Sequence, residues 1–192
     1  MLRYLVYALP LLAMVAVRIR AAEAEVKPTL ETATFAAGCF WGVESTFQSL
    51  PGVVSTRVGY TGGKTVNPTY EQVCAHGTGH AEAIEIKFDP AKISYQRLLE
   101  VFFENHDPTT LNRQGPDQGA QYRSAVFYHS PEQQKAAEAE KAKRDKSGEY
   151  VGLLVTEVTA AAPFYSAEEY HQRYYQKQGY AWSCHFGNGK KR

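Results

Sequence analysis

The chain has 192 residues, and at the usual ~150 residues per domain this length predicts one domain with a short additional segment. Its 21 lysines and arginines nearly balance its 20 aspartates and glutamates, and only Lys190 to Arg192 form a basic cluster, which argues against nucleic acid as a partner. A hydrophobic fraction of 44% excludes intrinsic disorder. Three cysteines are too few for a disulfide scaffold and leave at least one thiol unpaired or transiently paired.

The first 24 residues differ in composition from the rest. An apolar run from Tyr4 to Val17 follows a short positive start, and Ala22-Glu23-Ala24 has the A-x-A form of a signal-peptide cleavage site. The run is shorter than the ~20 residues that a membrane span needs. We therefore expect residues 1–24 to be a secretory signal that exports a single domain, residues 25–192, to the periplasm or the extracellular space. An uncleaved membrane anchor is the alternative, favoured by two arginines directly after the run.

Hydrophobic periodicity and turn signals predict alternating strands and helices along the rest of the chain. Strands are expected at 33–37, 53–60, 82–88, 122–128 and 151–158, and helices from Phe40 to the Pro51-Gly52 stop, after Ser94, from Ser130-Pro131 to about Lys146, and after a Ser166/Glu169 capping box. The segments 64–79 and 106–119 are expected to be irregular. This order predicts an α+β fold: a two-layer sandwich of a mixed β-sheet covered by helices, with a ferredoxin-like βαββαβ core and a long irregular C-terminal segment.

Cys39 stands at the turn between the first expected strand and the first expected helix. A thiol at a helix start is close to unpaired amide hydrogens and the positive end of the helix dipole, which favour the thiolate and depress the pKa. Phe40 and Trp41 would surround this thiol with aromatic surface. Cys39 is therefore a candidate nucleophile, and the alternative is a small buried cysteine that serves only packing.

Glu82 shares its strand face with Ile84, Ile86 and Phe88. Desolvation on an apolar face raises the pKa of a carboxyl group, so Glu82 could be protonated at neutral pH and donate a proton. The alternative is a structural carboxylate on an edge strand. The preceding loop holds Cys74, His76 and His80, which are metal-ligand types, but their spacing fits neither a C-x2-C pair nor two histidines on one helix turn.

Four motifs in one order resemble the type A peptide methionine sulfoxide reductases. They are Gly38 to Gly42 (GCFWG), Gly59 to Gly63 (GYTGG) with Pro68 to Cys74 (PTYEQVC), Gly79 to Glu82 (GHAE), and Asp117 to Ser124 (DQGAQYRS). The resemblance extends from about Ala33 to His185. Any one motif alone would be a weak signal, whereas four in register are specific. The resemblance implies reduction of the S epimer of methionine sulfoxide, free or in proteins, to methionine.

The resemblance also implies roles for individual residues. Cys39 would be the nucleophile, and Phe40 with Trp41 would form the pocket for the substrate methyl group. The side chains expected around the sulfoxide oxygen are Tyr70, Glu82, Asp117 and Tyr122.

In this family a recycling cysteine lies in a variable C-terminal segment, where the candidate is Cys184. Cys184 would convert a Cys39 sulfenic acid into a disulfide, which thioredoxin or a thioredoxin-like reductant would reduce. Cys74 matches a family position interpreted as structural. No metal, flavin or nucleotide cofactor is required, the substrates would be oxidised proteins or peptides, and we expect a monomer.

Two other function classes are compatible with the residues alone. A thiol hydrolase would need a histidine such as His80 or His185 to activate Cys39, and would consume no dithiol. A binding module without catalysis would tolerate Cys39→Ser.

Overall fold

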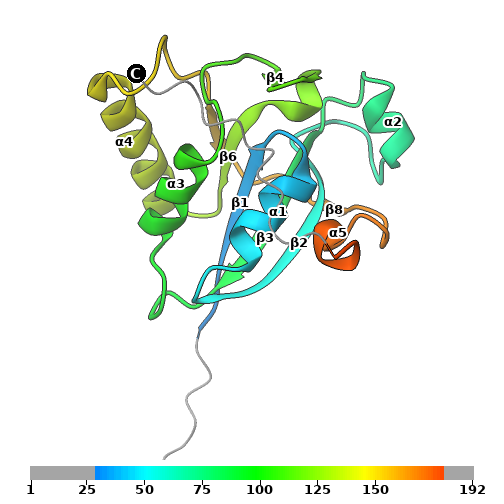
Figure 1. Ribbon diagram of the computed structural model, residues 1–192, viewed down its shortest axis with the longest axis horizontal. Helices are drawn as coiled ribbons and strands as arrows, with labels where there is room; N and C mark the ends of the chain where they lie inside the picture. The colour runs from blue at the N-terminus through cyan, green and yellow to red at the C-terminus, as the bar shows by residue number, and fades with distance from the viewer. Residues whose placement is uncertain (1–28, 180–192) are drawn as a thin grey trace, which may run out of the picture.

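The computed structural model describes residues 29–179, which form an α+β fold built around one six-stranded sheet (Figure 1). The strand order in this sheet is β7-β6-β1-β3-β2-β8, and all neighbours are antiparallel except the parallel pair β6 and β7. The strands are β1 (Glu31–Ala37), β2 (Val53–Thr61), β3 (Ala81–Phe88), β6 (Ser124–Tyr128), β7 (Glu157–Ala160) and β8 (Tyr165–Ser166). The four central strands have the ferredoxin-like order, which confirms the predicted fold class.

The helices begin and end at residues with clear local reasons. Ser94 and Ser130 each accept a backbone N–H of the following helix's first turn, and Gly148 ends the fourth helix in the left-handed conformation that glycine adopts readily. The helices are α1 (Phe40–Gln48), α2 (Tyr70–Cys74), α3 (Tyr95–Glu104), α4 (Pro131–Ser147) and α5 (Tyr174–Lys177). Within residues 29–179 no helix is both long and apolar enough to span a bilayer.

The main core lies between one face of the sheet and helices α1, α3 and α4. Phenylalanine rings dominate it: Phe35 stacks on Phe47 at 5.5 Å and on Phe102 at 5.1 Å between ring centroids. No methionine occurs in residues 29–179, so these rings fill the core without thioether side chains. The opposite face of the sheet is lined by alanines, Phe127 and the partly buried Phe164.

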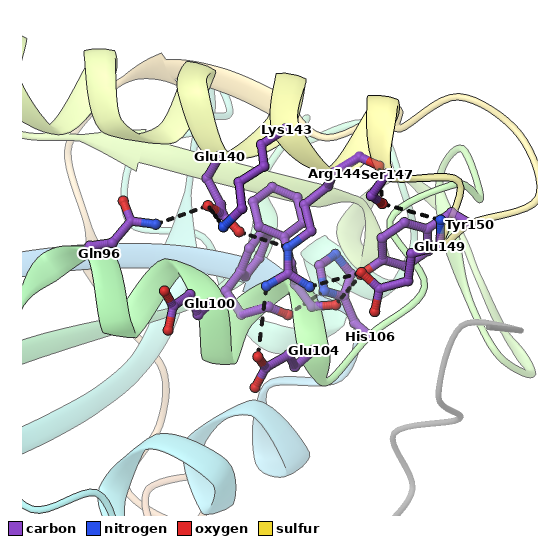
Figure 2. Close-up of polar contacts among 12 residues, drawn as sticks. Gln96, Glu100, Glu104, His106, Glu140, Lys143, Arg144, Ser147, Glu149 and Tyr150 are labelled. Carbon is purple, nitrogen blue, oxygen red and sulfur yellow. Dashed lines mark hydrogen bonds and ion pairs between the residues drawn. The ribbon is translucent and has the colours of Figure 1, made fainter.

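Helices α3 and α4 are joined by a charged cluster around Arg144 (Figure 2). Arg144 donates to Glu140 at 2.7 Å and to Glu149 at 3.2 Å, and its guanidinium lies 3.7 Å from Glu104. Glu140, which is 2% exposed, also accepts a hydrogen bond from Gln96. A buried arginine that is paired on several sides is costly to disrupt, so this cluster fixes the two helices against each other.

Several local expectations were wrong. The segment 64–79 contains α2, which begins with a complete capping box between Thr69 and Gln72. The last strand is Glu157–Ala160 rather than 151–158. Ser166 does not cap a helix, because it pairs with Gly59 as part of β8; the final helix starts at Tyr174.

The segment expected to be irregular between residues 106 and 119 holds a small hairpin. Its strands β4 (Arg113–Gln114) and β5 (Asp117–Gln118) form a separate two-stranded sheet, followed by a 3₁₀ helix, Ala120–Tyr122. The 3₁₀ helix delays the start of β6 to Ser124, two residues later than expected.

Candidate active site

Cys39 caps the N-terminus of α1, as the sequence predicted. Its carbonyl oxygen accepts the N–H groups of Gly42 at 3.2 Å and Val43 at 3.4 Å, which fixes the first turn of the helix. The preceding Gly38 has a φ of +91°, and a Cβ there would lie 2.6 Å from the Gln114 side chain. Glycine is therefore required immediately before Cys39.

The pKa of Cys39 differs from the expected direction. Burial raises it to about 12, and the negative charges of Glu82 and Asp117 add to this effect, whereas backbone hydrogen bonds from Trp41 and Gly42 only partly oppose it. The prediction of a depressed pKa was therefore wrong for the protein without substrate. Desolvation of the thiolate outweighs the helix N-terminus because the sulfur lies inside the site rather than at a solvated helix end.

Glu82 is buried at the start of β3, on the sheet face that α1 covers, as its strand parity predicted. It is 1% exposed, and its Oε2 accepts the N–H of Phe40 at 3.1 Å. Burial raises the pKa of Glu82 to about 8, aided by the charge of Asp117 and opposed by the Phe40 hydrogen bond. The site thus holds a protonated carboxyl next to a protonated thiol at neutral pH.

Two tyrosines come to the same site from different elements. Tyr70 is the first residue of α2, and Tyr122 ends the 3₁₀ helix that follows the β4–β5 hairpin carrying Asp117. Burial raises the pKa of Tyr122, and the charges of Glu82, Asp117 and Cys39 raise it further. The side chains of Cys39, Glu82, Asp117 and Tyr122 are therefore close enough for the charges among them to raise the pKa values of Cys39, Glu82 and Tyr122.

Tyr70 also interacts with the cysteine of its own helix. Burial raises the pKa of Tyr70, and a hydrogen bond to the Cys74 side chain contributes to the shift, as does the charge of Glu82. Cys74 is a free, half-buried thiol. Because Cys74 interacts with Tyr70, it lies at the edge of the site.

An aromatic wall lies beside Cys39. Trp41 is stacked on Tyr174 with ring centroids 3.9 Å apart and an angle of 10° between planes, and its Nε1–H donates to Nδ1 of His171 at 2.9 Å. The His171 ring also packs against two other rings, with its centroid 5.1 Å from that of Phe40 and 4.5 Å from that of Tyr70. Phe40 and Trp41 thus form one aromatic cluster with His171 and Tyr174, which come from the C-terminal part of the described chain.

Sequence reasoning missed His171. The residue is 1% exposed; because Nδ1 accepts from Trp41, neutral imidazole carries its proton on Nε2, which is buried without a partner in residues 29–179. A histidine in a polar segment carries no local signal of burial. Only the packing of that segment on α1 brings it to the site.

Glu168 ties the same segment to the strands and to α2. Its Oε2 accepts the Tyr60 hydroxyl, and its Oε1 accepts the backbone N–H of Tyr70, each at 3.0 Å. Burial alone would raise the pKa of Glu168, but these hydrogen bonds outweigh it and lower the pKa. Glu168 is therefore a charged anchor that helps to place Tyr70.

The histidines of the loop before β3 are engaged elsewhere. Nδ1 of His80 accepts the Gly63 N–H at 3.1 Å, and its Nε2 lies 2.8 Å from the Thr65 carbonyl oxygen. Nδ1 of His76 pairs with Gln121 at 3.1 Å. In residues 29–179 no three histidine, cysteine, aspartate or glutamate side chains form a cluster able to bind a metal ion.

A groove of about 760 Å³ lies between α1, β2 and the C-terminal part of the described chain, with Gln48, Val54, Arg57 and Arg173 among its lining residues, and Cys39 does not line it. Cys184, His185 and the expected signal at 1–24 all lie outside the described residues. Their assigned roles remain predictions.

The sequence of this chain is similar to those of a known protein family. Residues 31–192 match the family model described as peptide methionine sulfoxide reductase. A "Peptide methionine sulfoxide reductase MsrA" of Methanosarcina acetivorans is 56% identical over 151 residues, covering 79% of this chain and 80% of that protein. The protein of the same name from Geobacter sulfurreducens is 56% identical over 151 residues and is covered to 93%.

Solved structures show the same likeness. Mxr1 from Saccharomyces cerevisiae in reduced form superposes with a TM-score of 0.74 at 34% identity, covering 85% of this chain and 92% of that one. Methionine sulfoxide reductase A of Corynebacterium diphtheriae gives a TM-score of 0.72 at 37% identity, with 83% and 80% covered. Mxr1 in complex with Trx2 matches with a TM-score of 0.53 at 28% identity, covering 76% of this chain and 84% of that one.

Proposed function

This chain belongs to the peptide methionine sulfoxide reductase family, and from that membership and the site geometry we propose that it reduces the S epimer of methionine sulfoxide through Cys39. The observation that carries the proposal is a buried carboxyl, Glu82, bound to the N–H of the residue that follows Cys39. Sulfoxide reduction needs a sulfur nucleophile and an acid, because the sulfoxide oxygen is a poor leaving group unless it is protonated.

In the first step the oxygen moves from the substrate sulfur to the sulfur of Cys39. The substrate is reduced from sulfoxide to thioether, and the Cys39 thiol is oxidised to a sulfenic acid. No proton is gained or lost overall, because the thiol loses one proton and the sulfenic acid oxygen gains one. Glu82 serves this transfer by giving its proton to the oxygen and receiving the proton of Cys39.

The tyrosines and the aromatic wall position the substrate for this step. Hydroxyl groups of Tyr70 and Tyr122 would hold the sulfoxide oxygen as an oxyanion hole does. Phe40 and Trp41 would enclose the methyl group. Burial is the main cause of the raised pKa values of Cys39 and Glu82, and the charge of Asp117 adds to both shifts.

In the second step Cys184 attacks the Cys39 sulfenic acid. A disulfide forms between the two sulfurs and water leaves. An external dithiol then reduces this disulfide. A thioredoxin-like protein is the reductant that we propose, and the solved complex of Mxr1 with Trx2, from a protein of the same fold, supports that choice.

A thiol hydrolase is less well supported by the described site. Both ring nitrogens of His80 are bound to backbone groups, so this ring is not placed to take a proton from Cys39. His171 has its free nitrogen protonated when Nδ1 accepts from Trp41.

The test is to supply a sulfoxide-containing peptide with dithiothreitol and to measure thioether and oxidised dithiol together. A reductase consumes one dithiol for each thioether formed. A hydrolase or a binding module consumes none, and that result would reject the proposal.

We also propose that the protein is exported, with cleavage after Ala24. The support is the apolar run and the A-x-A site of the N-terminal sequence. N-terminal sequencing of the protein from the exported fraction should begin at Glu25. An intact Met1 on membrane-bound protein would identify an anchor instead.

A further inference from the structure

Glu44 is a buried carboxylate that the proposed reaction does not use. It lies on α1 and is 1% exposed. Its Oε1 accepts the Thr56 hydroxyl at 3.0 Å, and its Oε2 accepts the backbone N–H of Arg173 at 2.6 Å. Burying a carboxylate is costly unless it is hydrogen-bonded. An apolar side chain at this position could accept neither of these two hydrogen bonds.

The hydrogen bond from the Arg173 N–H to Glu44 lies at a turn whose backbone conformation is unfavourable. Arg173 has φ of +51° and ψ of +42°, the left-handed conformation, and it caps α5 without a side-chain hydrogen bond. A residue other than glycine rarely adopts this conformation unless its surroundings stabilise it. The carboxylate of Glu44 binds the N–H that this turn exposes, which stabilises the turn.

The turn lies between the two residues that hold Trp41. His171 accepts the hydrogen bond from the indole Nε1–H, and Tyr174 stacks on the ring at 3.9 Å. Trp41 and Glu44 are three residues apart on α1 and therefore face the same side of the helix. One helix face thus contacts segment 171–174 at two points, one through the indole ring and one through the carboxylate.

We propose that Glu44 is a positioning residue for the substrate pocket, fixing the left-handed turn at Arg173 so that His171 and Tyr174 hold Trp41 in place. This inference rests on the proposed function of the site and goes beyond it, because Glu44 touches neither substrate nor Cys39. Its effect is on substrate affinity, since Trp41 forms the pocket and takes no part in the proton transfer.

The experiment compares Glu44→Ala, Glu44→Asp and Glu44→Gln in single turnover without reductant, measuring thioether release against the concentration of a sulfoxide peptide. Glu44→Ala should raise the half-saturating concentration about tenfold, which corresponds to about 1.4 kcal/mol, and leave the limiting rate within about twofold. Glu44→Asp should lie between Ala and wild type, and it carries the test if Glu44→Ala does not fold. Glu44→Gln should restore most of the affinity, because its amide can accept from Arg173 and donate to Thr56.

A second readout follows Trp41 itself. In a Trp182→Phe background Trp41 is the one remaining tryptophan, so its fluorescence can be followed alone. Glu44→Ala and Glu44→Asp should make this fluorescence more easily quenched by acrylamide, because the ring loses its fixed neighbours.

The matched control is Glu140→Gln. Glu140 is also a buried carboxylate, 2% exposed, but it lies in the α3–α4 cluster of Figure 2. The Glu140→Gln substitution should lower thermal stability without changing the half-saturating concentration of the sulfoxide peptide or the acrylamide quenching of Trp41. A purely structural Glu44 would behave like this control, and that result overturns the inference. Absence of thioether release by wild type would instead reject the reaction, while the quenching result would still decide the role of Glu44.

Discussion

The N–H of Phe40 donates a hydrogen bond of 3.1 Å to Oε2 of Glu82, 42 residues further along the chain. This bond joins the first turn of α1 to the start of β3 and places the buried carboxyl beside the thiol of Cys39. The bond favours the charged carboxylate, yet burial outweighs it, and the pKa of Glu82 stays near 8. The same contact therefore fixes the geometry without ionising the acid.

Substitution of the two cysteines separates the two steps. Cys39→Ser should abolish thioether formation because no sulfur nucleophile remains. Cys184→Ser should release about one equivalent per enzyme and then stall as a sulfenic acid, since oxygen transfer precedes disulfide formation. Thioether counting together with intact-protein mass measures both outcomes. Sustained turnover of Cys184→Ser with thioredoxin would assign the resolving role to another thiol.

Glu82→Gln should slow single-turnover thioether release by about 10²- to 10⁴-fold, the usual contribution of a general acid. Stopped-flow measurements on folded protein determine the rate. Glu82→Asp should lie between the glutamine variant and wild type, because its carboxyl is one methylene further from the site. An unchanged rate for Glu82→Gln would transfer the acid role to Tyr70 or Tyr122.

The raised pKa of Glu82 also predicts how stability depends on pH. In the unfolded chain a glutamate loses its proton near pH 4.5, whereas burial holds the proton in the native state up to about pH 8. The native state binds more protons between these values, so the free energy of unfolding should fall as pH rises through this window. Urea titrations at several pH values should show this slope in wild type and a smaller one in Glu82→Gln.

The state of the Cys39 thiol can be tested by alkylation. Because burial raises its pKa to about 12, with Glu82 as the second cause, iodoacetamide should modify Cys39 slowly at pH 8 in the protein without substrate. Glu82→Gln removes that charge and should accelerate the modification. Peptide mapping is needed to distinguish Cys39 from Cys74. Rapid alkylation of Cys39 in wild type would indicate a thiolate and contradict the raised pKa.

The arrangement of the pocket predicts selection between the two epimers at sulfur. The methyl group would lie against Phe40 and Trp41, and the oxygen would point toward Glu82 and the tyrosines, so only one epimer has both groups in place. A racemic sulfoxide peptide should stop near half conversion, with the R epimer remaining when the products are separated by chiral chromatography. Equal rates for both epimers would contradict this arrangement.

The sheet, the three long helices and the position of Glu82 were predictable because each rests on local patterns. Strand parity placed Glu82, and serine caps marked α3 and α4. Helix α2 was missed although its capping box, Thr69 with Gln72, is visible in the sequence. The similar capping-box pattern of Ser166 and Glu169 predicted a helix start that does not form, because Ser166 pairs with β2 as part of β8.

Two features of the site had no local signal. The burial of His171 depends on how segment 171–174 packs on α1. The pKa of Cys39 depends on how much the folded chain desolvates the thiol, and the position of Cys39 at the start of a helix does not reveal that burial.

The ring-filled core has a consequence for the enzyme's own survival. Peroxide that creates methionine sulfoxide in other proteins finds no thioether in residues 29–179, because both methionines of the chain are at positions 1 and 14. Conversion of a buried methionine to the polar sulfoxide disrupts packing, and this fold contains none to convert. Oxidants that generate its substrate therefore find no methionine to convert in this core, and the sulfur atoms exposed to them in residues 29–179 are the thiols of Cys39 and Cys74.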